Sequence, residues 1–166
     1  KAAVRSFLAK LGSWQDFMLR HGPGGLTKSE RVGLVAELLT LETWLLGRCD
    51  GIDAVEAWLG PDDGAPDFVF GTRKLEVKGT TLRPARSFRA SNLVQLDDSG
   101  LDDLFVCHVT MFEPSRSGRT LPDIVQDMKD SLSSDNPLAK DRFVEKLLLA
   151  GYLDAQADLY RDETYS

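Results

Sequence analysis

Several features that mark common protein classes are scarce or missing in this chain. Its 166 residues include only two cysteines, Cys49 and Cys107, which lie far apart and exclude a disulfide scaffold. Their scarcity favours a reduced, cytoplasmic setting. The longest apolar run, residues 38–46, is interrupted by two threonines and a glutamate and is too short to cross a bilayer. No basic-then-apolar leader opens the chain, so nothing in it indicates secretion or a membrane partner.

A positive net charge is also missing. The sequence has 20 Lys and Arg against 26 Asp and Glu, a net charge of −6, which argues against a surface that coats nucleic acid. The charge is unevenly distributed, because residues 71–91 hold six cations and one acid; this segment carries +5 and the rest of the chain −11. We therefore expect an anionic partner to bind at residues 71–91, and only weakly without a divalent metal.

The chain is long enough for one domain with a buried core, and its patterns predict an α/β fold with a mixed sheet. Helices are expected over residues 2–20, 29–47, 121–132 and 137–149. Strands are expected over residues 67–70, 74–78, 86–90 and 104–112, with a helical turn over 92–96. The first two strands are predicted to form a hairpin around Gly71, and the last to be a buried central strand. Residues 54–59 fit either a strand or a short helix.

The chain divides into three regions. Residues 1–28 are expected to be a helical lead-in, and because the chain starts at Lys1 without Met, we interpret it as the remnant of a longer N-terminal region. Residues 29–152 are the predicted core, whose first helix begins at the capping sequence Thr27–Glu30. Residues 153–166 are expected to be a polar tail, either an edge strand or loose.

Acidic and basic side chains gather around the predicted hairpin. Asp67 begins one strand, and Glu76, Val77 and Lys78 lie on the next. The two-residue period of a strand puts Glu76 and Lys78 on one face and turns Val77 into the core, while the hairpin brings Asp67 across from that face. Glu37 lies on an otherwise apolar helix, where a carboxylate is costly unless it is paired or binds a ligand. The alternatives are a solvated strand face for the acid-x-Lys triplet and a helix-surface position for Glu37.

These side chains suit metal-assisted hydrolysis of a phosphodiester. Carboxylate oxygens are the ligands that Mg²⁺ prefers, and the backbone carbonyl of Val77 is a further candidate ligand. A bound metal acidifies water and stabilises charge on the phosphate. Lys78, beside the acids, is placed to position that water or to offset charge on the phosphorus.

The same residues resemble the PD-(D/E)XK nuclease superfamily, the fold of many restriction endonucleases. Pro66-Asp67 followed by Glu76-Val77-Lys78, with Glu37 on a preceding helix, is similar to its signature. The resemblance is closest to a subgroup of bacterial PD-(D/E)XK motif proteins of otherwise unknown function, which tend to be encoded among phage-defence genes. It runs from about residue 14 to about residue 152 and follows five segments in order: residues 33–39, 57–61, 67–68, 76–80 and 91–96.

The resemblance implies a restriction-endonuclease-like α/β fold, with a mixed central sheet flanked by helices. It also implies a Mg²⁺-dependent DNA endonuclease of restriction or phage defence, in which Mn²⁺ substitutes for Mg²⁺. By position, Asp67 and Glu76 would be metal ligands, Glu37 would help to bind metal or orient water, and Lys78 would be the catalytic lysine. Gln95 matches a family glutamine that would contact water or DNA, with a surface turn as the alternative. DNA and other defence proteins are the implied partners, and oligomerisation stays open.

Other side chains give weaker indications. Arg83, Arg86 and Arg89 follow the candidate active strand and are predicted to hold the DNA backbone, with a solvated edge as the alternative. His21 and His108 have no cysteine partners at zinc spacing, and His108 is expected to be a core residue. Two other function classes stay open. One is a non-cleaving DNA-binding or scaffold subunit that keeps the fold, and the other is an acidic interaction module in which the acid-x-Lys triplet is a coincidence.

Overall fold

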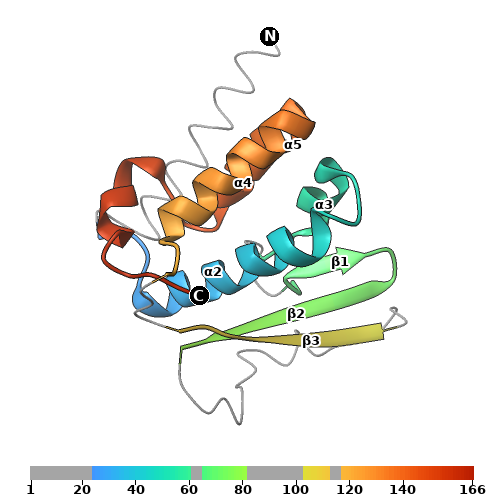
Figure 1. Cartoon of the computed structure of the whole chain (residues 1–166). Coiled ribbons are helices and arrows are strands. Elements are labelled where there is room, and N and C mark those ends of the chain that lie inside the picture. The colour runs from blue at the N-terminus through green and yellow to red at the C-terminus, as the bar shows by residue number, and fades with distance from the viewer. Residues whose placement is uncertain (1–23, 61–64, 82–102, 113–116) are drawn as a thin grey trace.

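The computed structural model describes residues 24–60, 65–81, 103–112 and 117–166, which form a mixed α/β arrangement (Figure 1). Its elements are α2 Lys28–Thr40, η1 Leu41–Leu45, α3 Gly51–Ala57, β1 Phe68–Phe70, β2 Arg73–Thr80, β3 Asp103–Thr110, α4 Leu121–Asp135, α5 Pro137–Leu149 and η3 Asp154–Tyr160. The predicted helix over residues 2–20, strand over 86–90 and turn over 92–96 lie outside the described residues. Within the described ranges, no helix is both long enough and apolar enough to span a bilayer.

Helix α2 begins where the sequence predicts. The backbone N–H of Glu30 donates to Thr27 Oγ1 (3.3 Å), and the N–H of Thr27 donates to Glu30 Oε2 (2.7 Å), which completes a capping box. The predicted helix over residues 29–47 is confirmed over most of its length, since the α-helix runs to Thr40 and continues as the π-helical turn η1 to Leu45. The expected burial is confirmed for Leu34, Val35, Ala36, Leu38, Thr40 and Leu41.

The predicted hairpin is confirmed. Strands β1 and β2 pair antiparallel, with Phe68 opposite Leu75 and Phe70 opposite Arg73. Gly71, in the turn, has a φ of 60°, a left-handed conformation that glycine adopts without a steric penalty. The hairpin therefore sets the register that brings the start of β1 beside the middle of β2.

The prediction that residues 104–112 form a buried central strand is wrong for the part of the sheet that the structure describes. Its strand order is β1-β2-β3, so β2 is central, and β3 pairs with it in parallel. The side chains of Phe105 and Val106 are 51% and 40% exposed. Apolar residues on both faces of a strand indicate burial in a parallel sheet, but composition alone does not say which neighbours the strand acquires.

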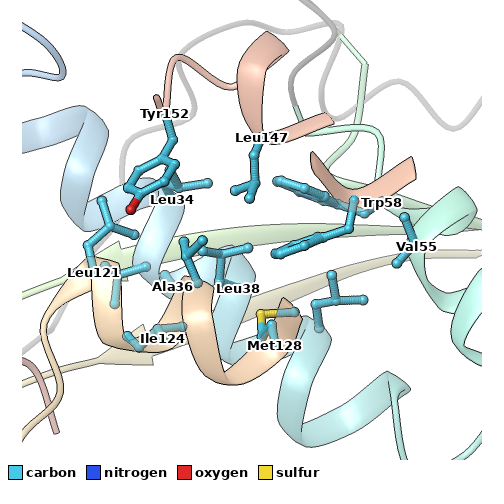
Figure 2. Close-up of a cluster of buried hydrophobic side chains, with 14 of the residues drawn as sticks. Leu34, Ala36, Leu38, Val55, Trp58, Leu121, Ile124, Met128, Leu147 and Tyr152 are labelled. Carbon is cyan, nitrogen blue, oxygen red and sulfur yellow. The ribbon is translucent and has the colours of Figure 1, made fainter. Parts of the chain in front are cut away.

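The described helices pack on one face of this sheet (Figure 1). Helix α2 approaches β2 closely at Gly79, where a Cβ would lie 2.7 Å from Ala36 Cβ and 2.8 Å from the carbonyl oxygen of Val32. Val77 is buried in the same core, as predicted. Figure 2 shows side chains from α2, α3, α4 and α5 converging in this core, among them Leu34, Leu38, Val55, Trp58, Ile124, Met128 and Leu147.

Both structures that residues 54–59 allow are present there. Helix α3 runs to Ala57, and Asp50 caps it by accepting a hydrogen bond from the N–H of Ile52 (3.0 Å). Trp58 then forms a single antiparallel bridge with Phe68 of β1. The chain therefore changes from helix to extended backbone at Trp58, nine residues before Asp67 in the sequence.

The two C-terminal helices are confirmed, α4 extending to Asp135, beyond the predicted end, and α5 having the predicted bounds. The segment over residues 153–166 is not loose, and its β pairing is limited to one antiparallel bridge between Tyr165 and Arg119. Most of it forms the 3₁₀ helix η3, whose Tyr160 is buried and accepts a hydrogen bond from the N–H of Leu26 (2.9 Å). Arg31 also donates to both carboxylate oxygens of Glu163 (2.8 and 2.7 Å). These contacts fasten the C-terminal segment to the start of α2.

Candidate functional site

Asp67 lies directly before β1 and is held by its side chain and its backbone. Its Oδ2 accepts a hydrogen bond from the N–H of Val77 (2.6 Å), which ties it to β2. Its carbonyl oxygen accepts from the N–H groups of Leu59 (2.7 Å) and Gly60 (3.0 Å). The side chain is almost fully buried, with 8% of the residue exposed. The hairpin thus places the Asp67 carboxylate against β2, as predicted.

Glu76 lies on β2 and is the most deeply buried acid of the site, with 1% of the residue exposed. Lys78 Nζ is 2.5 Å from its Oε1, so the two side chains share a face of the strand as the two-residue period predicts. Neither carboxylate oxygen of Glu76 accepts a hydrogen bond of good geometry within the described residues. A buried carboxylate normally has such donors, so Glu76 is an acid compensated by one neighbouring ammonium and otherwise unsatisfied.

Glu37 reaches the same region from α2. Its Oε2 accepts a hydrogen bond from the indole N–H of Trp58 at 2.8 Å. The residue is partly buried rather than solvated, which is the position that its apolar neighbours in sequence predict. Three carboxylates from separate elements, those of Glu37, Asp67 and Glu76, therefore act on one another, together with the ammonium of Lys78.

The electrostatics of this group show how close its charges lie. The pKa of Glu37 is raised to about 8, chiefly by burial and also by the charge of Asp67, while the hydrogen bond from Trp58 opposes the rise. The pKa of Asp67 is raised to about 7, again chiefly by burial and also by the charge of Glu76, while the hydrogen bond from the N–H of Val77 opposes the rise. Carboxyl groups that hold protons near neutral pH in each other's presence form a site that a cation would stabilise.

The carboxylates of Glu37, Asp67 and Glu76 are suitable ligands for a hard divalent cation, but they do not form a preformed metal site. No group of three or more His, Cys, Asp or Glu side chains in the described ranges lies close enough together to hold a metal ion. The chemistry nevertheless fits a divalent cation, because all the donors are carboxylate oxygens. The carboxylate of Glu76 pairs only with an ammonium, and burial and neighbouring acids raise the pKa values of Glu37 and Asp67. The carboxylates of Glu37, Asp67 and Glu76 would hold the ion. The carbonyl of Val77 as a further ligand stays a prediction.

His108, which was predicted to be a core residue, lies instead beside Lys78. His108 is exposed, and the parallel register pairs it with Lys78. Residues in register on neighbouring strands project from the same face of the sheet, so His108 flanks Lys78 on that face. The expectation of a satisfied core histidine is wrong, because His108 is exposed and none of the described helices packs on the face of β3 that bears it. The other predicted site residues, Gln95, Arg83, Arg86 and Arg89, lie outside the described residues.

Sequence reasoning missed two contributors to the geometry, Trp58 and Gly60. Both belong to residues 57–61, a segment on which the family resemblance rested but to which we assigned no role. Trp58 contacts Glu37, and Gly60 lies against both Glu37 and Trp58. The available indication was a tryptophan two residues before a Gly-Pro pair and shortly before the Pro-Asp motif, but a tryptophan at a helix end more often serves as core.

Comparison with protein-family models adds a finding that covers the whole chain. Residues 1–166 match the family model described as "Putative PD-(D/E)XK family member, (DUF4420)". No curated protein and no solved structure matches the chain significantly.

Proposed function

We propose, from the premise that this chain belongs to the DUF4420 family of PD-(D/E)XK proteins, that it is a DNA endonuclease dependent on divalent metal. It hydrolyses phosphodiester bonds and acts in the cytoplasm in restriction or phage defence. One observation supports this most strongly: the carboxylates of Glu37, Asp67 and Glu76, from three separate segments of the chain, lie within electrostatic reach of one another beside Lys78. A solvated strand face would not bury these acids.

The resident metal is proposed to be Mg²⁺, with Mn²⁺ as a substitute. When bound, it would acidify a water molecule and stabilise charge on the scissile phosphate. The protein's part is to supply oxygen ligands from Asp67 and Glu76, with Glu37 as a further ligand or as an acceptor that orients water. The burial that raises the pKa values of Glu37 and Asp67 also keeps bulk water from competing for these ligands.

Lys78 has a separate role in this proposal. Its ammonium lies 2.5 Å from Glu76, and its side chain is 19% exposed. It is therefore held at the rim of the buried acids, where it offsets negative charge and reaches toward an approaching phosphate. The uncovered neighbouring position of His108 extends the same face.

The DNA backbone is proposed to be held by Arg83, Arg86 and Arg89, with Gln95 near the reacting group. The supporting observation is in the sequence, since residues 71–91 carry a local charge of +5 in an acidic chain. The described end of β2 at Thr80 leads directly toward these residues along the chain. Weak DNA binding in EDTA and tighter binding in Ca²⁺ would agree with this placement.

The test is cleavage of supercoiled plasmid by the wild type and by Glu76→Gln and Lys78→Met, in Mg²⁺, Mn²⁺ and EDTA. We expect cleavage that requires metal and falls by about 100-fold or more in each variant, because each loses a group that stabilises charge in the transition state. Glu145→Gln, which alters an exposed acid on α5, is the control and should cleave like the wild type. Cleavage that persists in EDTA, or that is unaffected by both Glu76→Gln and Lys78→Met, would contradict the proposed mechanism.

The same experiment separates the main alternative. A chain that binds DNA in Mg²⁺ and in Mn²⁺ without cutting it would be a non-cleaving DNA-binding or scaffold subunit of a defence complex. DNA binding measured for the wild type and for Glu76→Gln tests this alternative, because the substitution should leave the DNA affinity of a non-cleaving subunit nearly unchanged.

A further inference from the structure

The backbone and side chains of residues 58–60 contact two of the three candidate metal ligands. We propose that Trp58 and Gly60 are positioning residues that set the Glu37 and Asp67 carboxylates for metal binding. The inference rests on the proposed function and deepens it, since it assigns a task to a segment that contributes no ligand of its own.

The first contact orients Glu37. The indole N–H of Trp58 donates to Oε2 of Glu37 at 2.8 Å, and Trp58 is completely buried. An indole N–H is a donor only, so it holds the carboxylate through one oxygen and leaves the other available. A glutamate side chain has several rotatable bonds, and a fixed donor on one oxygen removes much of that freedom.

The second contact fixes Asp67 through its backbone. The N–H groups of Leu59 and Gly60 both donate to the carbonyl oxygen of Asp67, at 2.7 and 3.0 Å. This pair of bonds complements the bond from Val77 N–H to the Asp67 carboxylate, so Asp67 is held through both its backbone and its side chain. One short segment therefore contacts ligands that come from α2 and from the start of β1.

Gly60 leaves space for this arrangement. A Cβ at this position would overlap Oε2 of Glu37, and it would lie 3.0 Å from Glu37 Cδ and 2.7 Å from Trp58 Nε1. The overlapped atom is the end of a flexible side chain, so the fold can accommodate an alanine by moving the carboxylate. Gly60→Ala should therefore displace Glu37 at a small cost in stability.

The segment is itself anchored in the core. The Lys146 ammonium, on α5, donates to the carbonyl oxygens of Trp58 (2.5 Å) and Glu56 (3.0 Å). The Trp58 ring also packs against Phe143, with ring centroids 6.0 Å apart. Phe143 supports the same ring, and its hydrocarbon side chain has no group that could hydrogen-bond to the acids, so it provides a matched control for loss of packing.

The experiment measures Mn²⁺ affinity by titration calorimetry, without DNA, for the wild type, Trp58→Phe, Gly60→Ala and Phe143→Leu. We expect Trp58→Phe and Gly60→Ala to bind Mn²⁺ about 10-fold or more weakly, the usual effect of removing a group that orients a ligand. Phe143→Leu should lower the unfolding midpoint while its folded fraction keeps the wild-type affinity. Gly33→Ala, at a helical glycine with nothing within 4 Å of its Cβ position, controls for glycine replacement.

A second readout tests the contact without metal. In an ¹⁵N-labelled sample, the Trp58 indole proton should be protected from exchange and should lose that protection in Glu37→Ala. An indole proton that is unprotected, or unaffected by Glu37→Ala, overturns the inference whether or not the protein cleaves DNA.

If the wild type binds Mn²⁺ and cleaves DNA but Trp58→Phe and Gly60→Ala behave like Phe143→Leu, the inference fails and the proposed function stands. A wild type that neither binds Mn²⁺ nor cleaves refutes the proposed function, and the indole proton alone then decides whether Trp58 holds Glu37.

Discussion

Stability of the metal-free protein should fall as the pH rises through neutrality. The pKa of Glu37 is raised from 4.5 to about 8 and that of Asp67 from 3.8 to about 7, in both cases chiefly by burial. At a pH between the ordinary and the raised pKa of each group, the folded state retains a proton that the unfolded chain has released. The unfolded state therefore binds fewer protons, and the free energy of unfolding decreases with pH from about 5 to about 8.

The magnitude follows from the same values. A rise of one unit in a folded-state pKa corresponds to about 1.4 kcal/mol. The raised pKa of Glu37 alone therefore allows the free energy of unfolding to fall by at most about 5 kcal/mol. Because Glu37 is partly accessible and its rise is shared with Asp67, we expect a loss of about 2–4 kcal/mol between pH 5.5 and 8.5. The lowered pKa values of Asp123 and Glu163 act below pH 4.5 and do not affect this window.

The assay is urea unfolding in EDTA at pH 5.5, 7.0 and 8.5 for the wild type and Glu37→Gln. The amide keeps an acceptor for Trp58 but removes the charge, so the variant should be about 2 kcal/mol more stable than the wild type at pH 8.5. At pH 5.5 the two should be similar. Glu145→Gln, an exposed acid on α5, should follow the wild type throughout. A wild type as stable at pH 8.5 as at pH 5.5, or a Glu37→Gln variant that gains nothing, would refute the electrostatic argument.

Three further substitutions test other parts of the structure. Gly79→Ala should destabilise the fold by about 1–3 kcal/mol in urea unfolding, because its Cβ would lie 2.7 Å from Ala36 Cβ in the contact between α2 and β2. Lys146→Met should cost about 1–3 kcal/mol, since two backbone carbonyls near the end of α3 lose a charged donor; an unchanged unfolding midpoint would contradict this. His108→Ala, next to Lys78 on the uncovered face, should weaken DNA binding measured in Ca²⁺ and leave Mn²⁺ affinity unchanged.

Local features of the fold were predictable because they depend on neighbours in sequence. The capping box from Thr27 to Glu30, the Gly71 hairpin and the two C-terminal helices all satisfy rules that act over a few residues. The hairpin in turn placed Asp67 against β2, because its register follows from its turn. Thus the most informative part of the candidate site, Asp67 with Glu76 and Lys78, was accessible from the sequence.

Features that depend on distant elements were not predictable in this way. The apolar composition of β3 indicated burial, but its exposure depends on which elements cover it, and His108 was misplaced for the same reason. The segment over residues 153–166 is too polar to predict packing, yet Tyr160 is buried beside the start of α2. The partner of its hydroxyl is the backbone N–H of Leu26, which is 134 residues away in the sequence.

The sequence by itself determined the chemistry: two carboxylates and a lysine on a hairpin, a third acid on an apolar helix, and segregated charge. Spacing and strand period are enough for this, because they set which side chains share a face. Only the tertiary structure decided how the acids are held, through Trp58 on Glu37 and residues 59–60 on Asp67. Those contacts join elements whose relative position depends on core packing, and the burial that raises the carboxyl pKa values is a property of that packing alone.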